Sequence, residues 1–278
     1  MYAHLKIKRM GGRVLLWVGA LAASAVFSGS ALAASPNAIS TTKHNLSSSG
    51  TGSNHAGADG TDQICVFCHT PHGAENSRGP LWNKAAGGPF TTYSGLLSGN
   101  TVAAVGSVSL ACLSCHDGSQ AMDNMINAPG PGMTWGGAGS SAVGTAGTGV
   151  FTTDGKISGA ANLGGDLSND HPIGVAYGGI ADTDGDDWKG YKSAAMGGGT
   201  AYWVDTATDG GAGARGRRDI QLYAPRDGIT GPMVECGSCH DPHIAKSGNA
   251  PDGKGDASLN FMRVSTAGSA ICLSCHIK

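Results

Sequence analysis

The segment Cys65-Val66-Phe67-Cys68-His69 sets the pattern that decides how this chain folds. The same Cys-x-x-Cys-His spacing occurs three more times, and the four motifs use all eight cysteines of the 278-residue chain. The other three are Cys112-Leu113-Ser114-Cys115-His116, Cys236-Gly237-Ser238-Cys239-His240 and Cys272-Leu273-Ser274-Cys275-His276. Two thiols at this spacing reach the vinyl groups on one porphyrin edge, and the adjacent histidine binds the iron as its proximal ligand. The spacing predicts four covalently attached c-type haems, with His69, His116, His240 and His276 as proximal ligands.

Three other uses of paired cysteines explain the pattern less well. Four Cys-x-x-Cys pairs could hold two Cys₄ zinc ions, but zinc does not explain a histidine after every second cysteine. Disulfides suit an exported chain, yet they require no fixed spacing. A thioredoxin-like redox pair would occur once, on a βαβ pattern that this sequence lacks.

The composition indicates a protein with an unusual core. The chain has 47 glycines and only 6% aromatic residues, so its side chains offer little apolar surface to offset the entropy lost on folding. Haem macrocycles would supply the missing apolar interior. We therefore expect a multihaem cytochrome c fold that is mostly irregular, with short helices at the Cys-x-x-Cys-His motifs, a few short strands and a core formed by haems.

The N-terminal residues have the pattern of a secretory signal peptide. Lys6, Lys8, Arg9 and Arg13 precede an apolar run over residues 14–27, which is followed by Ala31-Leu32-Ala33. The run is shorter than the ~20 residues that span a bilayer, and a small-x-small cleavage site follows it. We expect cleavage after Ala33, export, and no membrane span in the mature chain.

The remaining residues, 34–278, are expected to form a single tetrahaem domain. Cleavage would leave 14 Lys and Arg against 20 Asp and Glu, a net charge of −6. Nucleic-acid binding proteins carry basic patches that neutralise phosphates, so an acidic surface of this kind indicates no nucleic-acid partner.

The four motifs form an internal repeat. The first and third extend to Cys68-His69-Thr70-Pro71-His72 and Cys239-His240-Asp241-Pro242-His243, and the second and fourth share Cys-Leu-Ser-Cys-His. The order predicts two duplicated units, each a haem pair, over 65–116 and 236–276, separated by a Gly-rich insertion over 118–235. His72 lies too close to His69 in sequence to reach the opposite face of the same haem. We therefore expect His72, and likewise His243, to bind the iron of a different haem.

Four irons need four distal ligands, and the mature chain has five further histidines. By repeat order, His44 would serve the first haem, His72 the second, His171 the third and His243 the fourth. His55 lies in a Gly/Ser/Asn-rich stretch and is expected to be a surface loop residue rather than a ligand. Methionine is the other common axial ligand, but no methionine here has a repeated context. We expect bis-histidine ligation and low reduction potentials.

These motifs, in this order, resemble the doubled-CxxCH tetrahaem c-type cytochromes, which include the extracellular filament-forming (nanowire) cytochromes of metal-reducing microbes. The resemblance also covers Lys43-His44-Asn45-Leu46-Ser47, Pro80-Leu81-Trp82-Asn83 and Leu167-Ser168-Asn169-Asp170-His171-Pro172. It implies a continuous chain of closely packed haems and a homopolymer in which a neighbouring subunit donates one distal histidine, here His44, His55 or His72. Its implied redox partners are other cytochromes or extracellular metal oxides.

The insertion carries few other signals. Gly-rich segments over 130–149 and 197–216 make long helices improbable, whereas short strands are expected at 202–204 and 220–223. The acidic run that begins at Asp182 is similar to the start of a calcium loop but lacks the glycine and the bidentate glutamate. A solvated turn is favoured, and weak Ca²⁺ binding by Asp182, Asp184 and Asp186 is the alternative.

The function expected from the sequence is non-enzymatic electron transfer outside the cell or at its surface, in a chain that polymerises into a conductive filament. One alternative is a monomeric periplasmic carrier with the same ligands. The other is a multihaem reductase, which requires one iron with an open coordination position. Five histidines for four distal positions argue against such a vacancy.

Overall fold

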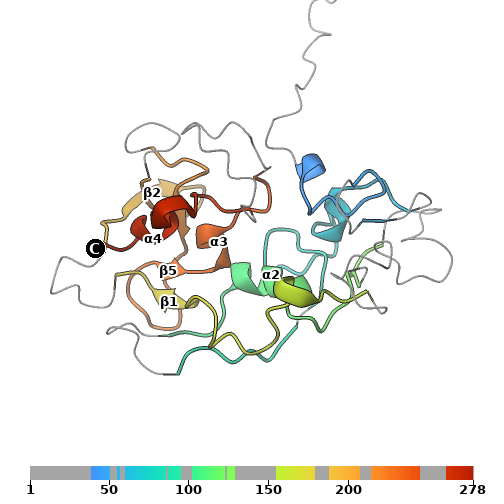
Figure 1. Cartoon of the computed structure of the whole chain (residues 1–278), viewed down its shortest axis with the longest axis horizontal. Coiled ribbons are helices and arrows are strands. Elements are labelled where there is room, and N and C mark those ends of the chain that lie inside the picture. Colours follow the sequence, from blue (N-terminus) through green and yellow to red (C-terminus); the bar gives the residue numbers. More distant parts are fainter. Residues whose placement is uncertain are drawn as a thin grey trace, which may run out of the picture. The chain divides into compact units, whose positions relative to one another are not determined.

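The computed structural model (Figure 1) describes residues 39–50, 55–56, 60–85, 87–94, 102–122, 124–128, 155–178, 188–206, 214–244 and 261–277. These ranges include all eight cysteines and every histidine except His4. The expected signal peptide (1–33), the Gly-rich segment 130–149 and the acidic run with Asp182, Asp184 and Asp186 lie outside the described residues. All described residues belong to one unit, Pro36–Lys278.

Helical turns lie at each of the four motifs. They are η2 (Cys65–Phe67), α2 (Ser107–His116), α3 (Cys236–Cys239) and α4 (Ala270–Leu273). Helix α2 follows an extended Gly106 and is ended by Gly118, whose φ of 69° is the left-handed conformation that closes many helices. Three further 3₁₀ turns are η1 (Ile39–Thr41), η3 (Gly159–Ala161) and η4 (Ala267–Ser269). None of the helices in the described ranges is both long and apolar enough to cross a membrane.

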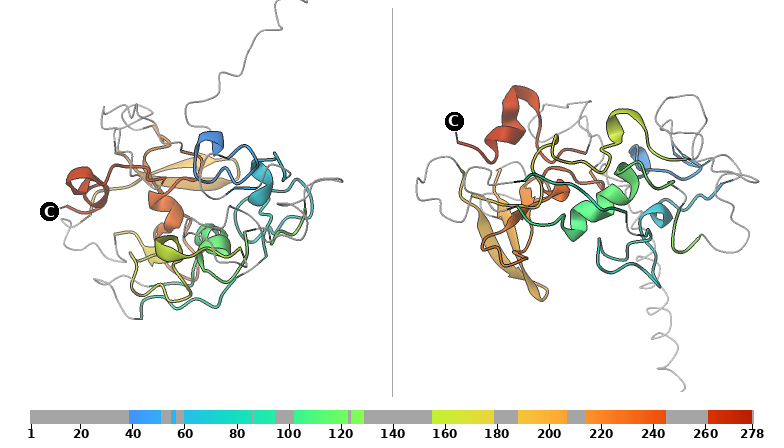
Figure 2. Two further views of the ribbon diagram at one scale, coloured as in Figure 1. Left: turned by 45° about the vertical axis from the view of Figure 1, so that its right-hand side comes forward. Right: turned by 90° about the horizontal axis from the view of Figure 1, so that it is seen from below.

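The strands of the described residues all come from the segment between the two repeat units. β1 (Val175–Ala176) pairs antiparallel with β5 (Met233–Val234), and β2 (Lys192–Met196), β3 (Gly199–Val204) and β4 (Ile220–Leu222) form an antiparallel sheet in that order. A Gly197-Gly198 turn with two positive φ angles joins β2 to β3, as a tight hairpin requires. Figure 2 shows this hairpin as a twisted ribbon. β3 contains the predicted strand 202–204, and β4 contains three of the four residues predicted at 220–223.

Two small apolar clusters accompany the motifs. One gathers Leu46, Ala56, Phe67 and Met122, and Cys68 and Cys115 pack against it. The other is made largely by the strands, and Cys275 packs against it; its buried members are Val175, Tyr177, Val204, Ile220, Leu222, Val234 and Val264. The segment between the units therefore supplies apolar packing for the last motif.

The internal repeat continues in the backbone beyond the motifs. After the first motif the chain returns so that Thr70 N donates to Leu81 O (2.9 Å) and Asn83 N donates to Cys68 O (2.9 Å). After the third motif, Asp241 N donates to Phe261 O (2.8 Å) and Arg263 N donates to Cys239 O (2.7 Å). Leu81 and Phe261 also share an unusual positive φ, 54° and 60°. Each unit is thus a Cys-x-x-Cys-His turn with an antiparallel return segment, residues 81–83 and 261–263.

The last side chain of each return segment donates a hydrogen bond to the carbonyl between the two cysteines of its motif. Asn83 Nδ2 donates to Val66 O (2.7 Å), and Arg263 Nε donates to Gly237 O (2.9 Å). Val66 and Gly237 occupy the same position between the two cysteines of their motifs. Asn83 and Arg263 therefore fix equivalent turns, although one is a neutral amide and the other a cation.

The segment between the units also contacts and positions the motifs of the second unit. β5 leads directly through Glu235 into α3, so its pairing with β1 positions the third motif. Trp188 forms a β-bridge with His276, and Lys189 N donates to Cys275 O (2.8 Å). Residues 118–235 are therefore more than a spacer, a role that their Gly-rich composition did not indicate.

Candidate functional site

The first two motifs meet at their second cysteines. All eight cysteines are free thiols. Cys68 and Cys115 pack against the same apolar cluster, and burial raises the pKa of the Cys68 thiol to about 12, with a smaller contribution from nearby Cys115. Burial likewise raises the pKa of Cys115. These thiols lie in the apolar surroundings that a porphyrin edge needs.

The later motifs continue the series in chain order. The Cys112 thiol forms a hydrogen bond with Cys236, which, together with burial, raises the pKa of Cys112 well above its ordinary value. The third and fourth motifs meet through Cys239 and Cys275, whose thiol pKa values burial raises to about 11 and about 12, each also raised by the other motif. The Cys112–Cys236 hydrogen bond therefore joins the second motif to the third. The first and second motifs, and the third and fourth, lie close enough for a thiol of one to raise the thiol pKa of the other.

The cysteines at the two ends of this series differ from those inside it. Cys65 of the first motif and Cys272 of the fourth are exposed, whereas the other six are partly buried. The series of cysteine motifs thus begins and ends at the surface.

Two of the predicted proximal histidines have one ring nitrogen engaged by a backbone carbonyl. His69 Nδ1 lies 2.8 Å from Pro80 O, and His116 Nδ1 lies 2.8 Å from Ala161 O. A carbonyl oxygen only accepts hydrogen bonds, so Nδ1 carries the proton in each ring and Nε2 of the neutral imidazole keeps its lone pair. Histidines that bind metals commonly use the other ring nitrogen in this way. The donor set therefore fits a haem iron bound through Nε2.

Two predicted distal ligands lie opposite proximal ones. The ring centres of His69 and His243 are 6.2 Å apart with an interplanar angle of 15°, and those of His44 and His116 are 6.2 Å apart at 65°. Burial, with a smaller contribution from His116, lowers the pKa of His44 to about 4, and burial also lowers the pKa of His116. Both rings are therefore neutral near pH 7 and able to bind a metal.

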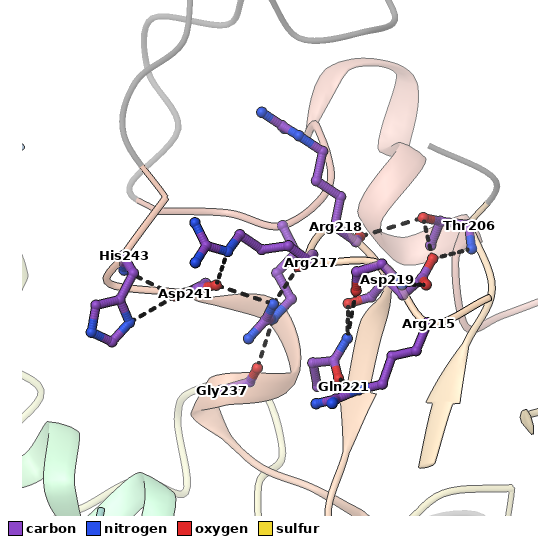
Figure 3. Close-up of polar contacts among 11 residues, drawn as sticks. Thr206, Arg215, Arg217, Arg218, Asp219, Gln221, Gly237, Asp241 and His243 are labelled. Carbon is purple, nitrogen blue, oxygen red and sulfur yellow. Dashed lines mark hydrogen bonds and ion pairs between the residues drawn. The ribbon is translucent and has the colours of Figure 1, made fainter. Parts of the chain in front are cut away.

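A charged network holds His243 in place, as Figure 3 shows. Asp241 Oδ1 accepts a hydrogen bond from His243 N (2.9 Å) and lies 3.3 Å from His243 Nδ1. Its Oδ2 lies 3.4 Å from the Arg263 guanidinium and 3.7 Å from that of Arg217. The hydrogen bonds from His243 and the charge of Arg263 hold the pKa of Asp241 below its ordinary value, against the opposing effect of burial.

The other predicted ligands are placed differently. In the described part of the chain, His55, His72 and His171 make no ring contact with another predicted ligand. His55 Nδ1 lies 2.7 Å from Ala56 O, and His171 Nδ1 lies 3.1 Å from Pro172 O. His72 is exposed, and its carbonyl accepts hydrogen bonds from Thr70 and Asn127. Of the remaining proximal histidines, His276 packs on Trp188 with ring centres 4.4 Å apart, and His240 lies near His44.

Buried polar groups support the motifs, and sequence reasoning missed them. Glu235, directly before the third motif, is 2% exposed; it binds Arg226 Nη2 (2.5 Å) and accepts from Ser109 Oγ (2.5 Å). Glu235 also caps α3 in a capping box with Ser238. In the first unit, the fully buried Lys84 donates to three carbonyls, those of Ala121, Met122 and Asn124. Ser109 and the carbonyls that Lys84 binds lie 37 or more residues from their partners in sequence, so no periodicity or motif marks these contacts.

Within the described ranges, no group of three or more His, Cys, Asp or Glu side chains is arranged to hold a bare metal ion. A haem iron receives its four equatorial ligands from the porphyrin, so only two protein ligands are required for each iron. A pair of histidines would consequently be sufficient to hold the iron of a haem.

The chain was also compared with known proteins. No protein-family model matches it, and no curated protein matches it.

Proposed function

We propose that this protein is an exported electron-transfer protein with four c-type haems, and that it works as a conduit rather than as an enzyme. The observation that carries the proposal is the order of the attachment sites. The thiols of successive motifs lie near one another from the first motif to the fourth, and Cys65 and Cys272 at the ends are exposed. Such a series suits electrons that enter at one end and leave at the other.

Each cysteine pair would hold one haem through thioether bonds, with His69, His116, His240 and His276 as proximal ligands. Bound haem iron supplies reversible one-electron chemistry, with a potential that depends on axial ligands, hydrogen bonds and burial. The chain's own contribution is to orient the ligands, as the carbonyls of Pro80 and Ala161 do for His69 and His116. The apolar clusters around Cys68, Cys115 and Cys275 would exclude water from the inner sites.

Polymerisation into a filament is part of the proposal. It rests on the resemblance to the doubled-CxxCH cytochromes, and the exposed ends of the series are compatible with end-to-end contact. The signal-peptide pattern at 1–33 supports export, and other cytochromes or extracellular metal oxides are the proposed partners. Ca²⁺ at Asp182, Asp184 and Asp186 stays a minor alternative.

The test is to express the chain in a host that exports and attaches c-type haem, and to measure intact mass, visible spectrum and ferric spin state. We expect four haem equivalents and low-spin irons. A paired Cys65→Ala/Cys68→Ala variant should lose one equivalent. A colourless product, or a mass increase other than four haems, would refute the proposal.

Electron microscopy of the secreted fraction tests the filament. Filaments support it, whereas particles of monomer size only would favour the periplasmic carrier. A high-spin iron in the native protein that binds CO rapidly when reduced would favour the reductase.

A further inference from the structure

The two imidazole pairs share a ring-centre separation of 6.2 Å, which in the nearly parallel His69–His243 pair is too long for face-to-face stacking. His44 packs face to face on Phe261 with ring centres 4.1 Å apart and planes 7° apart, which is an ordinary stacking contact. The separation of 6.2 Å in both the His69–His243 and the His44–His116 pair is about 2 Å longer. Each pair joins the histidine of a Cys-x-x-Cys-His motif to a histidine that lies outside these motifs.

A single metal ion between the two rings accounts for this spacing. With metal–nitrogen bonds of about 2 Å, two imidazoles on opposite sides of one ion have ring centres about 6 Å apart. Both nearly parallel and strongly inclined ring planes satisfy this requirement, because each ring can rotate about its own metal–nitrogen bond. The 15° and 65° angles are therefore both acceptable.

The side chains around the pairs present the correct nitrogen. Pro80 O and Ala161 O engage Nδ1 of His69 and His116, so Nε2 stays available in each. Asp241 Oδ1 lies 3.3 Å from His243 Nδ1, which is the carboxylate–histidine arrangement common behind metal ligands. Asp241 is itself held by Arg263, a residue of the second return segment.

The same return segment also positions His44, the remaining histidine of the two pairs. Phe261 precedes Arg263 by two positions and supports the face of His44. The second unit therefore positions both histidines that face the proximal ligands of the first unit, one through Asp241 and one through Phe261.

We propose that His243 is the distal ligand of the haem iron bound by His69, and that His44 is the distal ligand of the iron bound by His116. This inference rests on the proposed function. It differs from repeat order, which paired His44 with the first haem and His243 with the fourth. The two units are then interlocked, because the extension of the third motif completes the first haem site. His55, His72 and His171 are left for the irons of the second unit.

The test uses spin state in combination with haem deletion. His243→Ala alone should retain four haem equivalents and convert one low-spin ferric iron to high spin, measured by EPR. In a Cys65→Ala/Cys68→Ala background, which lacks the first haem, adding His243→Ala should produce no further high-spin iron. A new high-spin signal in that background would overturn the His243 assignment, as would a fully low-spin single variant.

The same design applies to His44 in a Cys112→Ala/Cys115→Ala background. Lys192→Ala, on the exposed β2 strand, is the control and should leave all four irons low-spin.

If the haem-deleted chains do not fold, a density map of the native protein decides the matter without variants. Density joining His243 Nε2 to the iron of the haem on Cys65 and Cys68 supports the pairing, and another residue there overturns it. A protein without four haems would instead refute the proposed function itself.

Discussion

The two repeat units, around the first and the third Cys-x-x-Cys-His motifs, have the same backbone plan but different supporting side chains. In both, a return segment pairs with the motif, and its last side chain binds the carbonyl between the cysteines. The first unit does this with the neutral Asn83, and the second with Arg263, which is paired with Asp241. The second unit also carries the buried Glu235 before its first cysteine, where the first unit has Ile64 and no side-chain cap.

The difference teaches that duplication preserved the turn and left its anchoring free to change. Asn83 is satisfied within its own half, by Val66 and Asn127. Glu235, in contrast, binds Arg226 and Ser109, the latter in the helix of the second motif. The second unit is therefore anchored through a carboxylate, whereas the charged anchor of the first unit is the Lys84 ammonium bound to carbonyls at 121–124. Variants at matching positions should expose that asymmetry.

The largest effect is expected at Glu235. Glu235→Ala removes the helix cap, leaves the Ser109 hydroxyl without its acceptor and removes the shorter of the two ion pairs of Arg226, which also lies 3.6 Å from Asp227. This should cost about 3–4 kcal/mol of unfolding free energy. Ile64→Ala, at the same position of the first unit, should cost about 1 kcal/mol, since it removes only part-buried apolar surface. Denaturant unfolding of the holoprotein measures both. Equal losses would mean that the charged anchor adds no stability.

The next largest effect is expected from replacing the residue that follows the first cysteine of a motif, Gly237 in the third motif and Val66 in the first. A Cβ on Gly237 would lie 2.1 Å from Tyr223 Oη and 2.8 Å from Val108 Cγ1, so the third motif has no room for the valine that the first motif carries. Gly237→Val should destabilise the protein by about 2–3 kcal/mol through overpacking. Val66→Ala, its counterpart, should cost about 1 kcal/mol. A Gly237→Val protein as stable as the native one would show that Tyr223 moves freely.

Loss of the neutral anchor should have a smaller effect. Asn83→Ala leaves the buried carbonyl of Val66 and the backbone groups of Asn127 without partners. We expect a loss of about 2 kcal/mol, measured by the same denaturant titration. Asn124→Ala serves as the matched control, because the Asn124 side chain is exposed and bonds only to Gln120 among the contacts described. The comparison fails if both asparagine variants lose the same amount.

The smallest effect is expected outside both units. Lys192 and Asp205 form an ion pair of 2.5 Å on the hairpin, where the Lys192 side chain is 43% exposed. Lys192→Ala should change the unfolding free energy by no more than about 0.5 kcal/mol, because surface pairs are screened by water and salt. Its thermal midpoint at low and high salt checks this, and a loss above 1 kcal/mol would assign the hairpin a structural role in the second unit.

Sequence reasoning could locate the motifs, the duplication and two of the strands, because each depends on local spacing or local composition. It could not find the second return segment, since Phe261, Met262 and Arg263 share no residue with Leu81, Trp82 and Asn83. The positive φ that Leu81 and Phe261 share is a property of the backbone that neither side chain indicates.

The pairing of His69 with His243 and of His44 with His116 could not be predicted from the sequence either. Repeat order assumes that each unit completes its own sites, whereas the ring distances bring His243 to His69 across the two units. Only the packing of the return segment on His44 and the anchoring of Asp241 by Arg263 place these rings, and both contacts join residues far apart in the chain.

The contact of Trp188 and Lys189 with the last motif has a consequence for maturation. The ribosome makes these residues before Cys272 and Cys275, so the surface that covers the fourth motif exists before its thiols emerge. At the first motif the order is reversed, because residues 81–83 follow their cysteines. If haem is attached after export as proposed, docking and thioether formation would compete for the fourth motif, whereas the first motif could be loaded before its cover arrives.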